Sequence, residues 1–134
     1  MPIRDIYVIH ESGLCLVSSH YYSGNSEPNM ISGFLIAMAN FAERIMGEAI
    51  QEIVFDQHQI IYKIIRPILV AIVITPQRAT KRKLNLLMKV ILTQFFEEYA
   101  GYLQEGLIEP SIFSDFTNSL DNILKAYFTM KQIK

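Results

Sequence analysis

The sequence has 134 residues, of which 51% are hydrophobic, and a formal net charge of −1. This length and composition favour a single folded domain over 1–134 and exclude a largely disordered chain. The near balance of 12 basic and 13 acidic residues gives no overall field that would attract nucleic acid. The only cysteine, Cys15, excludes an internal disulfide, and Arg4 and Asp5 interrupt the stretch where a secretory signal would need apolar residues, so a cytoplasmic location is expected.

The N-terminal third predicts two strands followed by a helix. Runs rich in β-branched and aromatic residues predict strands over 3–10 and 14–22, joined by a turn at Gly13. The polar segment 23–28 predicts a loop, and the helix that follows is expected to end at Gly47. Helical spacing predicts that the core-facing stripe of this helix consists of Ile31, Phe34, Leu35, Met38, Phe41, Ala42 and Ile45.

The rest of the chain predicts three strands and two helices. The strands are expected over 50–56, 59–66 and 68–75, and the helices over about 79–103 and from about Pro110 onward. The last strand lies in "PILVAIVITP", where eight residues between two prolines are too few to span a bilayer, which needs about 20. A continuous apolar run of this length is typical of a strand that is buried on both faces.

The predicted element order is therefore ββαβββαα, in the α+β class. The short connections at 11–13, 56–59 and Pro67 make consecutive strands antiparallel. One helix before the last three strands and two after them are expected to cover both faces of a five-stranded sheet.

Residues that commonly carry catalysis or bind metals are scattered along the sequence. No metal-binding spacing connects the three histidines, His10, His20 and His58, and Cys15 falls inside a predicted strand. The glutamate pairs 97/98 and 43/48 have no nucleophile or glycine-rich loop beside them. We therefore expect no enzymatic activity, no cofactor and no metal.

The segment "RATKRK", residues 78–83, is the only basic run in the chain. A solvated helix start is its simplest explanation. A contact with an anionic lipid headgroup or an acidic partner is the alternative, and it would make the membrane association peripheral. The residues available for it are Arg78, Lys81, Arg82 and Lys83. No aromatic residues are interleaved with these cations, which disfavours nucleic-acid binding.

The order ββαβββαα, with "IQEIVFDQHQIIYKIIRPILVAIVIT" leading into a long helix, resembles a longin domain over about residues 3–130. Longin domains are profilin-like modules of vesicle-trafficking SNAREs, adaptor and tethering complexes and small-GTPase exchange factors, and the roadblock family is a relative with a permuted start. Because no SNARE motif, anchor or adaptor trunk follows the third helix, the chain resembles a stand-alone longin of the kind suspected in archaea related to eukaryotes.

The resemblance implies a three-layer α-β-α fold with the strand order 2-1-5-4-3, in which "PILVAIVITP" forms the central strand. It also implies a non-enzymatic scaffold for protein–protein contact in trafficking or small-GTPase regulation. Longin and roadblock proteins commonly pair through the first helix and the third strand. The implied partner is a second copy of the chain, another longin or roadblock protein, or a small GTPase, in a homo- or heterodimer.

The first helix has no charged side chain from Asn29 to Ala42, although outer-layer helices normally expose Lys and Glu. Its neutral face is expected to pack against a partner, and the open edge of the third strand would extend that contact. The alternatives are a cover provided by the chain's own 23–28 segment and a lightly polar surface that binds nothing. The predicted partner-binding residues are Ser32, Gly33, Ile36, Ala37, Asn40, Ile50, Glu52 and Val54.

Two other functions compete with this interpretation. A ligand-sensing domain of the PAS or GAF type has a similar layout of sheet and helices, and a sheet that is open on one face would favour it. An enzyme with an unrecognised site would require His, Glu and Tyr side chains gathered around one pocket.

Overall fold

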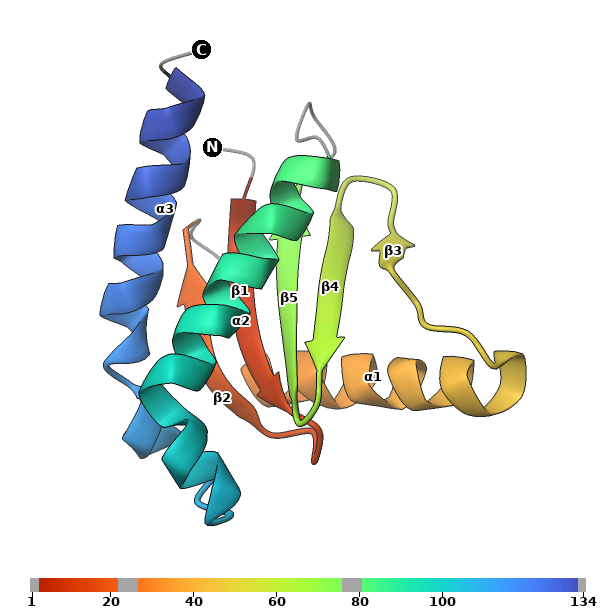
Figure 1. The fold of residues 1–134 in the computed structure, drawn as a ribbon. Coiled ribbons are helices and arrows are strands. Elements are labelled where there is room, and N and C mark those ends of the chain that lie inside the picture. Colours follow the sequence, from red (N-terminus) through yellow and green to blue (C-terminus); the bar gives the residue numbers. More distant parts are fainter. Residues whose placement is uncertain (1–2, 22–26, 76–80, 133–134) are drawn as a thin grey trace.

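The computed structural model describes residues 3–21, 27–75 and 81–132 (Figure 1). The observed order of elements is ββαβββαα, as predicted. A π-helical turn, Ala42–Met46, extends the first helix, and a 3-10 turn, Pro110–Phe113, precedes the last. The strands and helices are β1 (Ile3–His10), β2 (Cys15–His20), α1 (Pro28–Phe41), β3 (Glu52–Val54), β4 (Gln59–Ile65), β5 (Ile68–Ile74), α2 (Lys81–Gln104) and α3 (Phe116–Gln132).

The five strands form one sheet in the order β2-β1-β5-β4-β3, and every neighbouring pair is antiparallel. This confirms the strand order that the longin resemblance implies. All seven residues of β5 are buried, as expected for a central strand that is covered on both faces. Ala71 of β5 lies between Tyr7 of β1 and Tyr62 of β4, so a small side chain separates two large ones.

Helices cover both faces of the sheet. Figure 1 shows α2 crossing in front of the sheet, α3 beside it at the left, and α1 crossing behind it. The larger part of the core lies beneath α2 and α3, where Phe95 packs against Phe113 and Phe116 with ring centroids 5.5 and 5.1 Å apart. The smaller part lies beneath α1, where Leu35 packs with Leu69 and other residues of the opposite face. The α+β three-layer arrangement predicted from the sequence is confirmed.

Strands β2 and β3 and the last helix are clearly shorter than the sequence predicts, and β2 covers Cys15–His20 in place of 14–22. Strand β3 pairs with β4 only through Glu52–Val54, and the chain turns at once, with the Phe55 N–H donating to the His58 carbonyl oxygen at 2.7 Å. The last helix begins at Phe116 because Phe113 and Phe116, both fully buried, hold a separate 3-10 turn against the core. No described helix combines the length and the apolar character that a bilayer span requires.

Helix α1 faces the sheet with residues that match the prediction only in part, at Leu35 and Ala42. The inward residues are Ser32, Leu35, Ala39 and Ala42, three of which are small. Of the predicted core stripe, Phe34, Phe41 and Ile45 are instead exposed. The prediction placed the bulkiest residues inward, whereas the helix packs through its small residues and is rotated by about a quarter of a turn, at about 100° per residue.

Candidate protein-interaction surface

The rotation of α1 is set by polar contacts with the turn between β1 and β2. The Ser32 hydroxyl donates to the carbonyl oxygen of Gly13 at 2.5 Å and to that of Asn29 at 3.1 Å. The N–H of Cys15 donates to Oδ1 of Asn29 at 3.3 Å. Gly13 has φ +97, and a Cβ built on it would lie 3.9 Å from the Cα of Gly33, so the turn and the helix approach closely. Residues 29 and 32 are thereby held toward the turn.

This rotation leaves a row of large apolar side chains in solvent, which we call the α1 stripe. Its five members are between 46% and 69% exposed. They follow one another at helical spacing along the outer side of α1 and its π-helical extension. Soluble monomers seldom expose large contiguous apolar patches, and those that do commonly bind another protein or a membrane. The stripe consists of Met30, Phe34, Phe41, Ile45 and Met46.

Gly33, Ala37 and Asn40 are exposed on α1, beside the stripe, where the sequence predicted an open face. The prediction was wrong for Ser32, which is fully buried because its hydroxyl bonds to Gly13. Ile36 is half-buried and packs against the core beneath α1.

The predicted residues at the third strand lie at the sheet edge. Val54 is 68% exposed, and Phe55, directly after β3, is 47% exposed. Ile50 is half-buried, and so is Glu52, whose carboxylate accepts a hydrogen bond from the Gln59 side chain. Figure 1 shows the C-terminal end of α1 projecting past β4, on the side of the molecule where β3 lies. The apolar end of β3 therefore lies on the same side of the molecule as the end of the α1 stripe.

The second half of β4 continues beyond its pairing with β3. The paired residues of β4 are Gln59–Ile61, and one further bond joins the Tyr62 N–H to the Gln51 carbonyl oxygen at 3.3 Å. A cleft of about 480 Å³ lies along this edge. Its lining combines acidic, basic and apolar side chains: Glu43, Ala49, Ile50, Gln51, Ile61, Tyr62, Lys63, Ile64, Arg66 and Asn85. An added strand or loop of a partner would meet both charge signs there.

Sequence reasoning missed the α1 stripe itself. It treated Phe34, Phe41 and Ile45 as core because apolar residues lie on almost every side of α1, so periodicity alone does not define one inward face. The uncharged run from 29 to 42 was the correct signal that this helix lacks an ordinary solvent face. Small residues at positions 32, 39 and 42 were the signal for its close packing on the sheet.

The described titratable side chains outside this surface include a cluster at Asp5 and the thiol of Cys15. Asp5 accepts a hydrogen bond from Nδ1 of His20 at 2.7 Å and lies 3.5 Å from Nε of Arg4, which makes a charged pair at the β1–β2 edge. Burial raises the pKa of the Cys15 thiol to about 11, and this thiol donates to the Val17 carbonyl oxygen, so it stays protonated at neutral pH. Within the described ranges, no three His, Cys, Asp or Glu residues gather closely enough to hold a metal ion.

The basic run contributes exposed charge at the start of α2. Arg82 is exposed and Lys83 is half-buried. Arg78 and the side chain of Lys81 lie outside the described part of the chain. The two described cations stand on the face of the sheet opposite α1.

The solved structure of Myxococcus xanthus MglB is similar to this fold, with a TM-score of 0.55 over 72% of this chain and 85% of MglB. The sequence identity is 14%, so the similarity concerns the fold alone. No protein-family model matches the sequence, and no curated protein matches it. Together with the strand order and the helices on both faces, the similarity to MglB, a protein of the roadblock/longin fold, shows that this chain has a longin/roadblock-like fold.

Proposed function

We propose that this protein is a non-enzymatic interaction module that self-associates through the α1 stripe and the β3 edge. The exposed α1 stripe carries the proposal, because five large apolar side chains along this helix and its π-helical extension are 46–69% exposed in the described chain. Burial of an exposed Phe or Met side chain stabilises a complex by roughly 1.5–3 kcal/mol, so a few of them are enough for a dimer contact. The short β3 and its exposed Val54 extend the same contact to the sheet edge.

The proposed pathway role is small-GTPase regulation at or near membranes, as part of vesicle trafficking in the cytoplasm. The longin/roadblock-like fold supports it, because this group of folds includes modules of GTPase exchange factors and trafficking complexes. The mixed charges along the open half of β4 offer a second contact region for such a partner. Another longin or roadblock protein would use the same α1 and β3 residues in a heterodimer.

The competing function, ligand sensing by a PAS- or GAF-like domain, has less support. An open sheet face would favour it, whereas helices lie on both faces of this sheet in the described part of the chain. Native mass spectrometry that detects a co-purified small molecule would reverse this preference.

The self-association test uses two substitutions on α1. A Cβ at Gly33 would meet nothing within 4 Å, so Gly33→Arg leaves the fold of the subunit intact and blocks only an approaching partner. Phe34→Glu places a charge in the α1 stripe. We expect the wild type to be dimeric by light scattering at micromolar concentration and both variants to shift toward monomer. Leu107→Glu is the matched control, since Leu107 is 42% exposed and lies away from α1.

A wild type that stays monomeric, or variants that dimerise as the wild type does, would contradict self-association through α1. The GTPase role has its own measurement. Small GTPases from the same organism, loaded with GDP or with a non-hydrolysable GTP analogue, are tested for binding and for nucleotide exchange and hydrolysis rates. Binding that depends on the loaded nucleotide supports the role, and its absence across the panel removes it.

A further inference from the structure

Charge is segregated along the face formed by α2 and α3. The first turn of α2 carries Arg82 and Lys83, whereas its C-terminal half carries Glu97 and Glu98. Helix α3 returns from the junction in the opposite direction, with Asp121 before Lys125. In Figure 1 the two helices meet at their lower end and diverge upward, so the acidic residues gather near the junction and the basic ones away from it.

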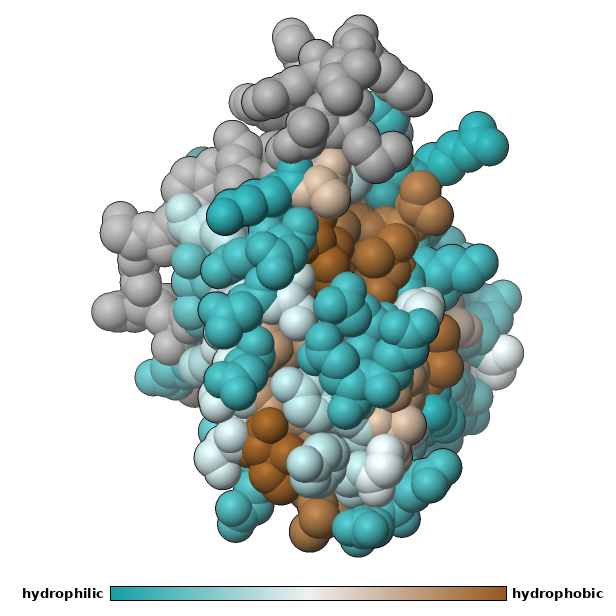
Figure 2. All heavy atoms as spheres, turned by 60° about the vertical axis from the view of Figure 1, so that its left-hand side comes forward, coloured by the Kyte–Doolittle hydropathy of each residue, from teal (hydrophilic) through white to brown (hydrophobic). Residues whose placement is uncertain are grey.

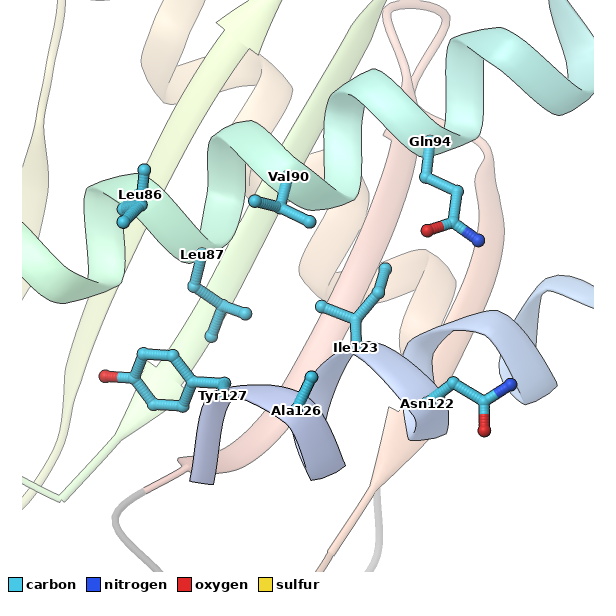
Figure 3. A pocket seen from close by; sticks show the side chains of 8 residues that line it. All are labelled: Leu86, Leu87, Val90, Gln94, Asn122, Ile123, Ala126 and Tyr127. Carbon is cyan, nitrogen blue, oxygen red and sulfur yellow. The ribbon is translucent and has the colours of Figure 1, made fainter. Parts of the chain in front are cut away.

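An apolar strip separates the two charged ends. Leu86 is 63% exposed and Val90 is 43% exposed, although both lie in the middle of an outer helix. They border a groove of about 390 Å³ between the helices, and Figure 3 shows Ile123 and Ala126 on its α3 side. The space-filling view of the side that carries α3 shows apolar patches between hydrophilic side chains (Figure 2).

The charges on this face are not neutralised within the described chain. The four ion pairs among described residues join Arg4 and His20 to Asp5, and Arg66 to Glu11 and Glu43, and none involves α2 or α3. Glu98 accepts hydrogen bonds from Gln94 and Ser119. Lys83 and Glu97 make no described polar contact.

The spacing of these residues is symmetric about Val90. Lys83 lies seven residues before Val90 and Glu97 seven residues after it, which is about 10 Å on either side at 1.5 Å per residue. Seven residues are close to two turns, so all three side chains point to the same side of α2. A twofold axis through Val90 would therefore place Lys83 of one copy over Glu97 of another, twice, with Leu86 and Val90 between the pairs.

We propose that this face of α2 binds α2 of a second copy in antiparallel orientation. The arrangement is self-complementary, as a twofold contact between identical chains requires. It buries the exposed apolar strip and gives Lys83 and Glu97 charged partners, which neither has among the described residues. Charge complementarity distinguishes a second copy from a lipid surface, which would meet the acidic half of the face unfavourably.

This contact is separate from the proposed dimer through α1 and β3, because α1 and α2 lie on opposite faces of the sheet. At concentrations above the micromolar range of the α1 dimer, where both twofold contacts are occupied, the chain forms assemblies larger than a dimer in which the contacts alternate. The inference therefore goes beyond the proposed function, and each contact can fail without the other.

The test reverses charges on α2 in a chain that also carries Phe34→Glu, the substitution that removes the proposed α1 contact. Lys83→Glu alone and Glu97→Lys alone are each expected to weaken self-association about tenfold at low ionic strength, equivalent to about 1.4 kcal/mol, because each reversal disrupts two equivalent pairs. Mixing the two variants restores association, because one pair then joins the two substituted positions with opposite charges and the other joins the unchanged Lys83 and Glu97. Sedimentation velocity measures the parent chain, each variant and the mixture.

Lys89→Glu is the matched control, since it makes the same charge change about 100° around the helix from Val90. Val90→Glu is expected to weaken the contact about a hundredfold, because it brings a charge into the apolar strip. Circular dichroism confirms that each variant is folded. The proposal is overturned if the Phe34→Glu chain is monomeric at millimolar concentration, if the reversals behave as Lys89→Glu does, or if the mixture shows no gain. If Val90→Glu weakens the dimer and Phe34→Glu leaves it unchanged, the α2 contact is supported and only the α1 contact is refuted.

Discussion

The hydroxyl of Ser32 donates a hydrogen bond to the carbonyl oxygen of Gly13, which joins a fully buried polar side chain of α1 to the turn between β1 and β2. This bond and the one from the Cys15 N–H to Asn29 hold one side of α1 toward the hairpin. The opposite side, with Phe34 and Phe41, is therefore left in solvent.

We expect Ser32→Ala to lower the free energy of unfolding by about 1–2 kcal/mol, because it removes the hydrogen bond that the buried Ser32 hydroxyl donates to Gly13. Urea denaturation of a chain that carries both Phe34→Glu and Val90→Glu, which disrupt the two proposed contacts, measures this without a contribution from dimer dissociation. The exposed Ser111→Ala is the control and is expected to stay within about 0.5 kcal/mol of its parent. Equal losses in the two variants would show that the Ser32 contact does not position α1.

The thiol of Cys15 is expected to react slowly with a disulfide reagent at neutral pH. It is buried, and its pKa is raised to about 11, so little of the reactive thiolate is present. Unfolding in urea should expose one fast-reacting thiol per chain. The absorbance of the product released from the reagent measures the reaction rates of the folded and the unfolded chain. Fast reaction of the folded chain would contradict the buried position of Cys15.

The raised pKa of the Cys15 thiol makes the stability of the fold fall at alkaline pH. The unfolded chain loses the Cys15 proton near pH 9.0, whereas the folded chain keeps it until about pH 11. Between these values the unfolded state binds fewer protons, so the free energy of unfolding falls as pH rises. Denaturant titrations at several pH values measure the slope, and Cys15→Ala is expected to reduce it. An unchanged slope in that variant would assign the dependence to other groups.

Tyr62→Phe is expected to raise the free energy of unfolding by up to about 1 kcal/mol. The Tyr62 hydroxyl is buried with no hydrogen-bond partner among the described atoms, and burial raises its pKa to about 12. Removal of a buried hydroxyl that has no partner also removes its desolvation cost. Thermal unfolding measures the gain, and Tyr102→Phe, at a side chain that is 45% exposed, is the control. A loss of stability would mean that the hydroxyl has a partner in solution.

Arg66→Ala is expected to cost less than about 1 kcal/mol. Arg66 lies 2.7 Å from the carboxylate of Glu43 at the end of α1 and 3.3 Å from that of Glu11 in the β1–β2 turn. All three side chains are about half exposed, so solvent weakens the pairs and high salt should remove most of the difference. Urea titrations at low and high salt measure it, with the exposed Arg44→Ala as control. A large loss that is insensitive to salt would contradict this account.

The sheet could be predicted from the sequence because the evidence for it is local. Strand β5 shows its central position through a continuous apolar run, and β1, β2 and β4 show theirs through β-branched residues and turn signals. The short connections determine the antiparallel pairing. The complete strand order came from the resemblance to longin domains.

The inward face of α1 could not be predicted in the same way. Apolar residues lie around most of this helix, so its periodicity allows several rotations. The rotation is set by contacts of Ser32 with Gly13 and of Asn29 with Cys15, which join segments 19 and 14 residues apart. The break at Phe113 likewise depends on a stack with Phe95 of α2, and pattern reasoning along one segment does not include such contacts.

Because α1 rests on the sheet through Ser32, Leu35, Ala39 and Ala42, the residues that hold this helix in place are a different set from those of the α1 stripe. If the stripe binds a partner as proposed, substitutions at Met30, Phe34 or Phe41 change the partner that is bound at little cost to the fold. Evolution could thus redirect the binding specificity of such a module while its core sequence stays under separate constraint.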